Sequence, residues 1–584
     1  MKTRYKTGNI FTDVKVEKFP RHHFDKSYFN RFTCNHGLAI PFFVDEVSPG
    51  DRIDVKTFGR IQLQPLATSS MQNLRCYFRY FYVPFRLLWE NWDKFMTQDS
   101  QSEIAIKAPY TVLFYNQLNG MKDNVGGLGD MLGLNLFNPD KTQTNRNIGL
   151  PYTQDSVLQF NVFRWAAYHL IWDYYFRDEN LQEEVFLPLK DGYNNSYVSR
   201  LQTLLPVAYE KDYFTSALPW PQKGDPVNLS AQLFSQNNDL LYFVGQDGTT
   251  KFGLTSGAPF KVSAKTSDEY VTGVGSDGEG NTFYSYADGV DVNNNYNNLN
   301  LAIVYNNEGI NGQGPLRLDT QEFTTSFNIN DLRYSNALQR FLERKALGGS
   351  RPAEFYLSMY GVRVDDLRIG QPLYLGGGYS NVQVTDVTQQ SQTTSGADGS
   401  PLGTLAGNGK SFPAMKMNNP YYCQEFGIVM GIMYIRPEIN YSQGLDRRLQ
   451  LFDTLDYYNP VFAHLGEEAV KTSELYIKPS INNSTDVVGA AELNNDETFG
   501  YQSRYAYLKH KRNEVHGDFK TSLSNWVLSV AFEDKPTLDD SFITVDQNYD
   551  IFAVTEATEH HYLVELYNNY QAECNMPNFV IPSL

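Results

Sequence analysis

Short apolar runs of strand length, separated by much longer polar stretches, constrain the fold of this chain more than any other feature. The clearest run is Cys-Tyr-Phe-Arg-Tyr-Phe-Tyr-Val at residues 76–83, which ends at Pro84. Two segments, 161–176 and 331–347, instead space their apolar residues as a helix does. Many strands, few helices and long polar insertions predict a mainly β fold, an antiparallel sandwich or jelly roll. The other predicted strands lie at residues 38–47, 53–66, 427–436, 526–532 and 549–554.

The stretch from residue 228 to 315 has a different composition. It is rich in Asn, Gly and Asp, and its nine acids and three lysines give a net charge of −6. Strand-like pieces remain at residues 240–244 and 301–305. We interpret the stretch as a surface insertion with a modest β structure of its own, and residues 376–411 as a second polar loop.

Charge is distributed unevenly along the chain. Residues 1–31 hold eight Lys/Arg and three Asp/Glu, a net charge of +5, which leaves −22 for the remainder of a chain whose total is −17. An acidic body argues against a dedicated nucleic-acid-binding protein. The sequence therefore predicts three parts: a basic arm at residues 1–31, a main domain formed by 32–227 and 316–584, and the insertion at 228–315. The arm is either a solvated tail or a contact for phosphates.

No motif in the chain predicts catalysis or a cofactor. Residues 273–278 fit G-x-G-x-x-G, but an Asn/Gly-rich stretch follows where a helix would be needed, so we interpret them as loop glycines. Gly409-Lys410-Ser411 lacks the glycine that a phosphate-binding loop needs at position 404. The pairs His22-His23 and His560-His561 would point to opposite faces of a strand. A calcium site built from loop acids stays open, so the metal content is not predicted.

Cysteine spacing and hydropathy indicate the kind of cellular compartment in which the chain folds. The four cysteines form no disulfide or zinc pattern, which indicates a reducing site of folding. The first residues show no secretory signal, and no apolar stretch is long enough to span a membrane.

Several sequence blocks resemble the major capsid proteins of the Microviridae, in particular the gokushovirus-like branch. The most specific block is Asp-Tyr-Phe-Thr-Ser-Ala-Leu-Pro-Trp-Pro-Gln-Lys-Gly at residues 212–224. The blocks follow one another from about residue 20 to the C-terminus, and only the insertion and parts of the 376–411 loop lack them. The other blocks are residues 20–27, 37–41, 44–51, 83–92, 94–96, 171–181, 329–333, 342–344, 348–351, 374–378, 441–445, 460–467 and 499–502.

The resemblance implies a viral jelly roll of eight antiparallel strands, with long inserted loops and a few short helices. It implies that sixty copies form a T=1 icosahedral shell around circular single-stranded DNA, and that the chain is not an enzyme. In the gokushovirus-like branch an insertion forms a protrusion at the threefold axes, where residues 228–315 are expected to lie and to recognise a host-cell receptor. Implied partners are an internal scaffolding protein, a DNA pilot protein and a small basic DNA-binding protein. The implied location is the virion, assembled in the bacterial cytoplasm.

Two sets of candidate functional residues follow. Phosphate contacts are expected from the basic arm, and subunit contacts from exposed aromatic anchors, although core packing explains each aromatic equally well. The arm candidates are Lys2, Arg4, Lys6, Lys15, Lys18 and Arg21, and the interface candidates are Trp89, Trp92, Phe95, Trp172 and Trp220.

Two other classes of protein compete with a capsid subunit. A secreted β-sandwich that binds or cleaves carbohydrate would also have aromatics and long loops, but it predicts a signal peptide and, for cleavage, a placed carboxylate pair. A minor spike or fibre protein is disfavoured, because the family blocks span the whole predicted barrel.

Overall fold

A computed structural model describes most of the chain, which forms two compact units: Met1–Gly224 with Leu342–Leu584, and Asp225–Phe341. The predicted insertion 228–315 falls within the second unit. The described residues are 21–97, 106–114, 125–134, 157–224, 232–235, 242–244, 251–253, 273–276, 282–285, 317–318, 323–326, 329–347, 352–363, 370–388, 405–477, 497–556 and 558–578.

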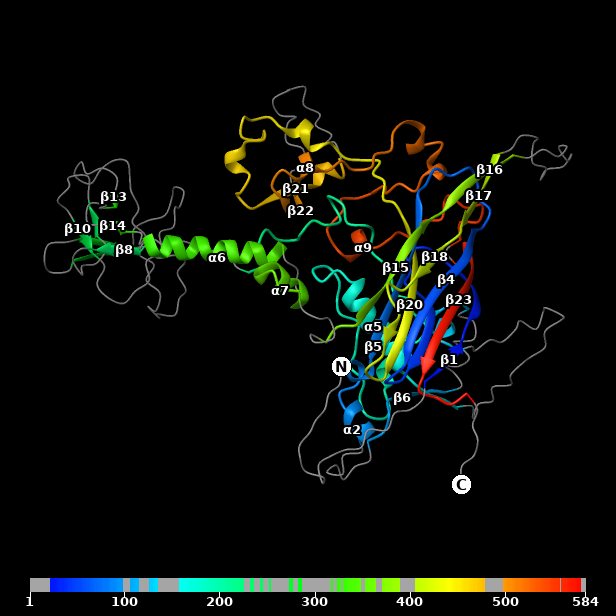
Figure 1. The fold of residues 1–584 in the computed structure, drawn as a ribbon. Helices are drawn as coiled ribbons and strands as arrows, with labels where there is room; N and C mark the ends of the chain where they lie inside the picture. The colour runs from blue at the N-terminus through cyan, green and yellow to red at the C-terminus, as the bar shows by residue number, and fades with distance from the viewer. Residues whose placement is uncertain are drawn as a thin grey trace, which may run out of the picture. The chain divides into compact units, whose positions relative to one another are not determined.

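The first unit contains an eight-stranded antiparallel sheet, which we call the β23 sheet after its longest strand, Tyr562–Cys574 (Figure 1). Its strand order is β1-β23-β4-β17-β16; β2 also pairs with β23, and β18 and β19 pair with β4. The remaining bounds are β1 His22–Asp25, β2 Tyr28–Cys34, β4 Arg52–Leu63, β16 Gln383–Thr388, β17 Leu405–Ser411, β18 Ala414–Lys416 and β19 Tyr421–Tyr422.

A second antiparallel sheet, the β20 sheet, has the order β15-β5-β20-β3. Its strands are β3 Ile40–Val47, β5 Leu74–Pro84, β15 Leu373–Asn381 and β20 Gly427–Pro437. The pairing of β15 with β5 shifts register between Tyr374 and Gly376. The following Gly377 has φ 154°, and a Cβ there would lie 2.0 Å from the carbonyl oxygen of Phe78. Glycine is therefore required at this position, where the backbone of the edge strand β15 lies against the backbone of β5.

The two sheets share one apolar core. Inward residues such as Val55 and Ile61 on β4, Phe78 on β5 and Leu566 on β23 are at most 1% exposed and belong to a single cluster. Alternating exposed and buried residues along β4 and β23 show that one face of the β23 sheet packs inward and the other faces solvent. A buried polar chain crosses the sandwich: the Tyr80 hydroxyl donates to Thr57 Oγ1 at 2.6 Å, and Thr57 donates to Asn568 Oδ1 at 2.7 Å.

Helix α5, Phe163–Tyr175, covers the opposite face of the β20 sheet. Phe81 and Met430 on that face share a second apolar cluster with Tyr168 and Ile171 of the helix. Ten of the eleven residues of β20 are buried, because the strand is covered on both faces. The helix predicted over 161–176 is confirmed.

Helices and further strands occupy the long connections between these strands. The helix predicted over 331–347 is confirmed as α6. The other bounds are α1 Phe85–Leu88, α2 Trp92–Thr97, β6 Tyr110–Phe114, α4 Leu128–Met131, β7 Val157–Asn161, η1 Asn195–Arg200, α6 Ile329–Leu347, α7 Pro352–Tyr360, η3 Arg447–Gln450, η4 Pro460–Phe462, β21 Glu467–Lys471, η5 Thr472–Glu474, β22 Thr498–Ser503, α8 Ala506–Lys509, η6 Gly517–Lys520, η7 Ser524–Trp526 and α9 Asp540–Ile543.

The second unit contains small antiparallel pairings. Strand β8 pairs with β14, β9 with β10 and β13, and β11 with β12. Of the G-x-G-x-x-G glycines expected in a loop, Gly273 and Gly275 instead lie in strand β11, and Gly278 lies outside the described residues. The predicted strand at 240–244 is confirmed by β9, and that at 301–305 lies outside the described residues. The bounds are β8 Gln232–Ser235, β9 Tyr242–Val244, β10 Lys251–Gly253, β11 Gly273–Ser276, β12 Thr282–Ser285, β13 Arg317–Leu318 and β14 Phe323–Ser326.

Several predictions about the main domain are corrected or confirmed by these elements. The mainly β, antiparallel class is confirmed. The strands predicted at 526–532 and 549–554 are wrong, because these segments form turns and isolated bridges. Residues 22–31 of the predicted basic arm are not a tail, since β1 and the start of β2 pair with β23. All four cysteines are free and buried, as the absence of a disulfide pattern predicted.

Candidate subunit interface

An exposed apolar loop, residues 449–465, lies in the long connection between β20 and β23. Phe452 is 86% exposed and Val461 77%, and the other large apolar side chains of the loop that face solvent are Leu449, Leu455, Tyr457, Tyr458 and Leu465. Single exposed apolar residues are ordinary on a protein surface, but seven large ones within one loop make this loop a candidate interaction surface.

Local hydrogen bonds fix the shape of the apolar loop. The Asp456 carboxylate accepts the backbone N–H groups of Phe452 and Asp453, each at 2.9 Å, and these bonds lower the pKa of Asp456. The Asn459 side chain caps η4 by accepting the N–H of Val461 at 3.0 Å. The loop thus presents its apolar side chains from a hydrogen-bonded turn, which reduces the entropy lost on docking.

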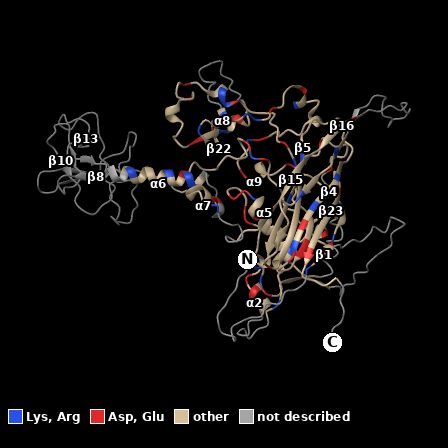
Figure 2. Cartoon of the chain, viewed as in Figure 1, with Lys and Arg blue, Asp and Glu red and all other residues tan. Residues whose placement is uncertain are grey.

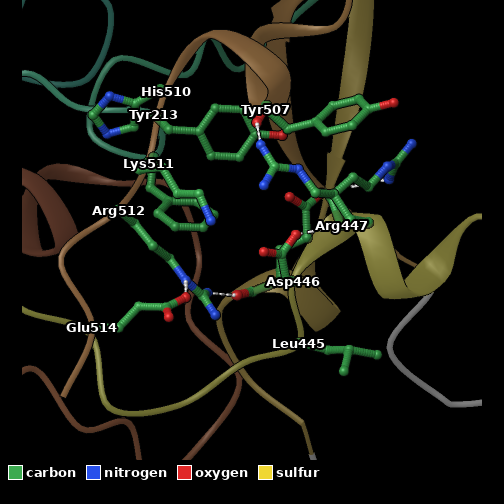
Figure 3. A pocket seen from close by; sticks show the side chains of 12 residues that line it. Tyr213, Leu445, Asp446, Arg447, Tyr507, His510, Lys511, Arg512 and Glu514 are labelled. Atoms are coloured by element: carbon green, nitrogen blue, oxygen red, sulfur yellow. Dashed lines mark hydrogen bonds and ion pairs between the residues drawn. The ribbon is translucent and has the colours of Figure 1, made fainter. Parts of the chain in front are cut away.

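The base of the loop is held by a buried ion network beside a small pocket (Figure 3). Arg447, whose side chain is 13% exposed, lies 2.9 Å from Glu468 and 3.4 Å from Glu474. Burial raises the pKa of Glu474, while the N–H of Lys471 and the charge of Arg447 oppose that rise. Gly444 has φ 94°, and a Cβ there would lie 2.0 Å from the Glu474 carbonyl oxygen, so the chain can pass the network only at a glycine.

We expect Arg447→Met to lower the free energy of unfolding by about 3 kcal/mol, because it leaves the buried Glu474 carboxylate without its cation. Urea unfolding of the unassembled subunit measures the change. The matched control is Arg52→Met, since Arg52 lies 3.8 Å from Glu573 with both side chains about half exposed; it should cost less than about 1 kcal/mol. Equal losses in the two variants would contradict the role of the buried network.

Two of the tryptophans predicted at a subunit interface belong to the core. Trp89 is 1% exposed and donates its indole N–H to Asp191 at 2.7 Å, and Trp172 is 3% exposed and donates to the Pro206 carbonyl at 2.7 Å. Both sit in the cluster that α5 shares with the β20 sheet. The interface prediction for these two residues is corrected, because their rings are already covered within the subunit.

The other three interface candidates are half-buried. Trp92 packs edge-on and Phe95 packs tilted against Trp89, with ring centres 6.3 and 5.3 Å away from it. The ammonium group of Lys223 lies 6.0 Å from the Trp220 ring. Part of each of these rings stays accessible, so their role in subunit contacts remains a prediction.

Among the arm candidates, only Arg21 lies within the described residues; Lys2, Arg4, Lys6, Lys15 and Lys18 lie outside them. Arg21 donates to the Tyr422 hydroxyl and to Asn575 Oδ1, each at 3.2 Å, and its guanidinium lies 5.0 Å from the centre of the Tyr422 ring. This side chain therefore anchors the start of β1 to the β23 sheet.

Sequence reasoning did not identify the apolar loop. Its apolar residues follow neither a helical nor a strand period, so the pattern predicts no element and no exposed face. Residues 460–467, which overlap the end of the loop, do form one of the family blocks, and this was the available indication.

The described residues contain neither a metal-ligand cluster nor a membrane-spanning helix. No group of three or more His, Cys, Asp or Glu side chains there is arranged to hold a metal ion. No helix in this part of the chain combines the length and apolar character that crossing a membrane requires.

Two stacked antiparallel sheets, oversized connections and an exposed apolar loop are features typical of a structural protein that assembles with copies of itself. A family model described as "Capsid protein (F protein)" matches residues 12–584, and the chain belongs to this family. It is 31% identical to capsid protein VP1 of Chlamydia phage 1, covering 99% of this chain and 98% of that protein. It is 30% identical to capsid protein VP1 of Bdellovibrio phage phiMH2K, covering 92% and 91%, and 27% identical to capsid protein VP1 of Spiroplasma virus 4, covering 94% and 93%.

The resemblance to Microviridae capsid proteins is thereby confirmed, and the chain has the structural role of a major capsid protein. The carbohydrate-binding or carbohydrate-cleaving alternative receives no support from these relatives.

Proposed function

We propose that the chain is the repeating subunit of a T=1 icosahedral shell of sixty copies, built on an eight-stranded jelly roll, with no catalytic activity of its own. The observation that carries the jelly roll is strand pairing. Taking β2, β3, β4, β5, β15, β17, β20 and β23 in chain order, the first pairs with the last and each next strand pairs with the next one inward. The additional pairings of β23 with β4 and β20 with β5 are those that rolling up such a long hairpin creates.

The long connections supply the contacts between copies. The largest run from β5 to β15 and from β20 to β23, and the apolar loop belongs to the second. In a closed shell each contact repeats around a symmetry axis, so weak contacts add up to a stable particle.

The basic arm and the shell interior are proposed to hold circular single-stranded DNA. The support is the +5 charge of residues 1–31 against −22 for the remainder. Since an acidic body cannot neutralise a genome, a small basic DNA-binding protein is proposed to share this role. A scaffolding protein and a DNA pilot protein are proposed as assembly partners in the bacterial cytoplasm.

The insertion at 228–315 is proposed to form a protrusion at the threefold axes that recognises the host cell. Its net charge of −6 and its Asn/Gly-rich composition support an exposed position. Particles that lack the insertion should form but adsorb poorly to host cells; normal adsorption would contradict this role.

Electron microscopy and sedimentation of the expressed full-length chain, alone and with its scaffolding partner, test the shell. The expected result is a closed particle of sixty subunits. A chain that stays monomeric under both conditions, or a shell with another subunit number, would overturn the proposal.

A further inference from the structure

The solvent face of the β23 sheet carries a row of three aromatic side chains, one from each of three neighbouring strands. Phe29 of β2 lies opposite Tyr567 of β23, and Tyr567 lies opposite Phe58 of β4. The ring centres of Phe29 and Tyr567 are 4.9 Å apart. Phe29 is 60% exposed and Phe58 44%, whereas the residues on either side of Phe58 and Tyr567 in the sequence point inward or are less exposed. The three side chains of the row lie outside the apolar core, so core packing does not explain why all three are aromatic.

Positive side chains flank this aromatic row. In the next cross-strand row Arg31 and Arg60 both lie opposite Glu565, and Lys56 follows on the other side of Phe58. The Arg31 guanidinium lies 5.3 Å from the centre of the Phe29 ring and 2.7 Å from Glu565. Figure 2 shows basic segments on β4 next to acidic segments on β23. The outward charges of β2, β4 and β23 are Arg31, Arg52, Lys56 and Arg60 against Asp54, Glu565 and Glu573, a positive balance in a chain whose net charge is −17.

We propose that this face binds unpaired bases of single-stranded DNA, with the bases stacked on the aromatic row and the phosphates beside Arg31, Arg60 and Lys56. The inference rests on the proposed function and names the surface that the packaged strand would use. Exposed aromatics next to arginines are the usual platform for single strands, because every base offers a flat face and stacking needs no sequence match.

The attachment of the basic arm supports DNA over a second copy of the chain as the occupant. Residues 1–31 carry a net charge of +5, and β1, which belongs to this stretch, pairs with β23 at the edge of this same sheet. A contact between copies would instead favour an apolar centre depleted of charge, as the apolar loop provides. The charges of the face and of the arm match a polyanion.

Binding of a fluorescent oligo-dT to the unassembled full-length subunit tests the proposal by anisotropy. The double variant Phe29→Leu/Phe58→Leu keeps apolar bulk but removes two rings, and should bind at least about tenfold more weakly. Phe29→Tyr/Phe58→Tyr keeps the rings and should bind within about threefold of wild type. The matched control is Phe452→Leu in the apolar loop, which should leave oligonucleotide binding unchanged.

An abasic oligonucleotide of the same length separates stacking from charge. Wild type should bind oligo-dT about tenfold more tightly than the abasic strand, and the Leu variant should lose most of this difference while keeping its salt dependence. Equal binding of the two strands by wild type, or unchanged binding of oligo-dT by the Leu variant, would overturn the inference.

Shell formation is scored separately, so that failure of the inference and failure of the proposed function are distinguishable. If the Leu variant binds oligo-dT like wild type but forms no shells, the face is a contact between copies, which overturns the inference and leaves the proposed shell intact. If wild type forms no shells while the ring-dependent binding holds, the proposed function fails and the binding surface stands.

Discussion

Replacing Phe452 and Val461 together by Asp is expected to abolish shell formation while leaving the subunit folded. Both side chains are more than three-quarters exposed in the isolated chain, so the change removes no core contact. In a docked interface each would bury an apolar side chain, a gain of roughly 1.5–3 kcal/mol. A carboxylate buried there without a partner adds several kcal/mol of cost. Because every subunit repeats the contact, even a partial loss at one site multiplies through the particle.

Sedimentation velocity and electron microscopy measure this effect, with circular dichroism to show that the variant is folded. The matched control is Phe452→Leu/Val461→Ile, which keeps apolar side chains at the same positions and should assemble in wild-type yield. The assignment of the apolar loop as an interface would be wrong if the Asp variant formed shells as well as the control.

The strands that were predicted correctly are those whose apolar surroundings in the fold give a clear apolar pattern in the sequence. Strand β20 lies between the sandwich core and α5, so both of its faces are apolar and its residues read as one continuous run. Strand β5 shares these neighbours and shows the same pattern. Turn residues such as Pro84 then fix where the run ends.

Strand β23 was missed for the opposite reason. Its outward positions include Glu565, Asn569 and Gln571, and its inward row is interrupted by Asn568, whose side chain accepts the hydrogen bond of Thr57. The apolar period is thereby broken, and only pairing with β4 and β2 explains the strand. Residues 549–554 were mistaken for a strand because Tyr549 and Phe552 are buried in the core, although they lie in a turn. The apolar content of a segment indicates that the segment is buried, but it does not indicate whether the segment pairs with another strand.

The candidate sites show the same limit. The segment around Trp89 and the apolar loop are both rich in large side chains. Composition does not distinguish a ring that is buried within its own subunit from one that is exposed and available to contact another subunit. Exposure follows from the tertiary arrangement of α5 and the loop base, which no local pattern encodes. The capsid role was found because the family blocks persist through the strands and loops alike, independently of which residues are exposed.

The unassembled subunit is expected to lose stability steeply as the pH falls from 6.5 to 5. His36 and His169 are at most 1% exposed, and burial lowers the pKa of each to about 4. The neutral rings are held by hydrogen bonds: His36 to the Asp546 carbonyl at 3.1 Å, and His169 to the Trp165 carbonyl at 2.7 Å. Below pH 6.5 the two histidines bind protons in the unfolded chain, whereas in the folded chain they stay neutral until about pH 4. Proton binding therefore stabilises the unfolded state, and the free energy of unfolding falls.

Each histidine contributes about 1 kcal/mol per pH unit averaged over that window, together about 2, and burial lowers the pKa of His561 in the same direction. Carboxylates with ordinary pKa values remain ionised above pH 5, whereas the raised pKa of the buried Glu474 gives a pH dependence of opposite sign, so the histidine variants are needed to isolate the histidine contribution. Urea unfolding at several pH values measures it, and His36→Gln and His169→Gln should each remove about half of the two-histidine slope. The exposed His464 provides a control, since His464→Gln should leave the slope unchanged. Stability that stays flat between pH 6.5 and 5 would show that protons reach the two buried rings without unfolding the sandwich.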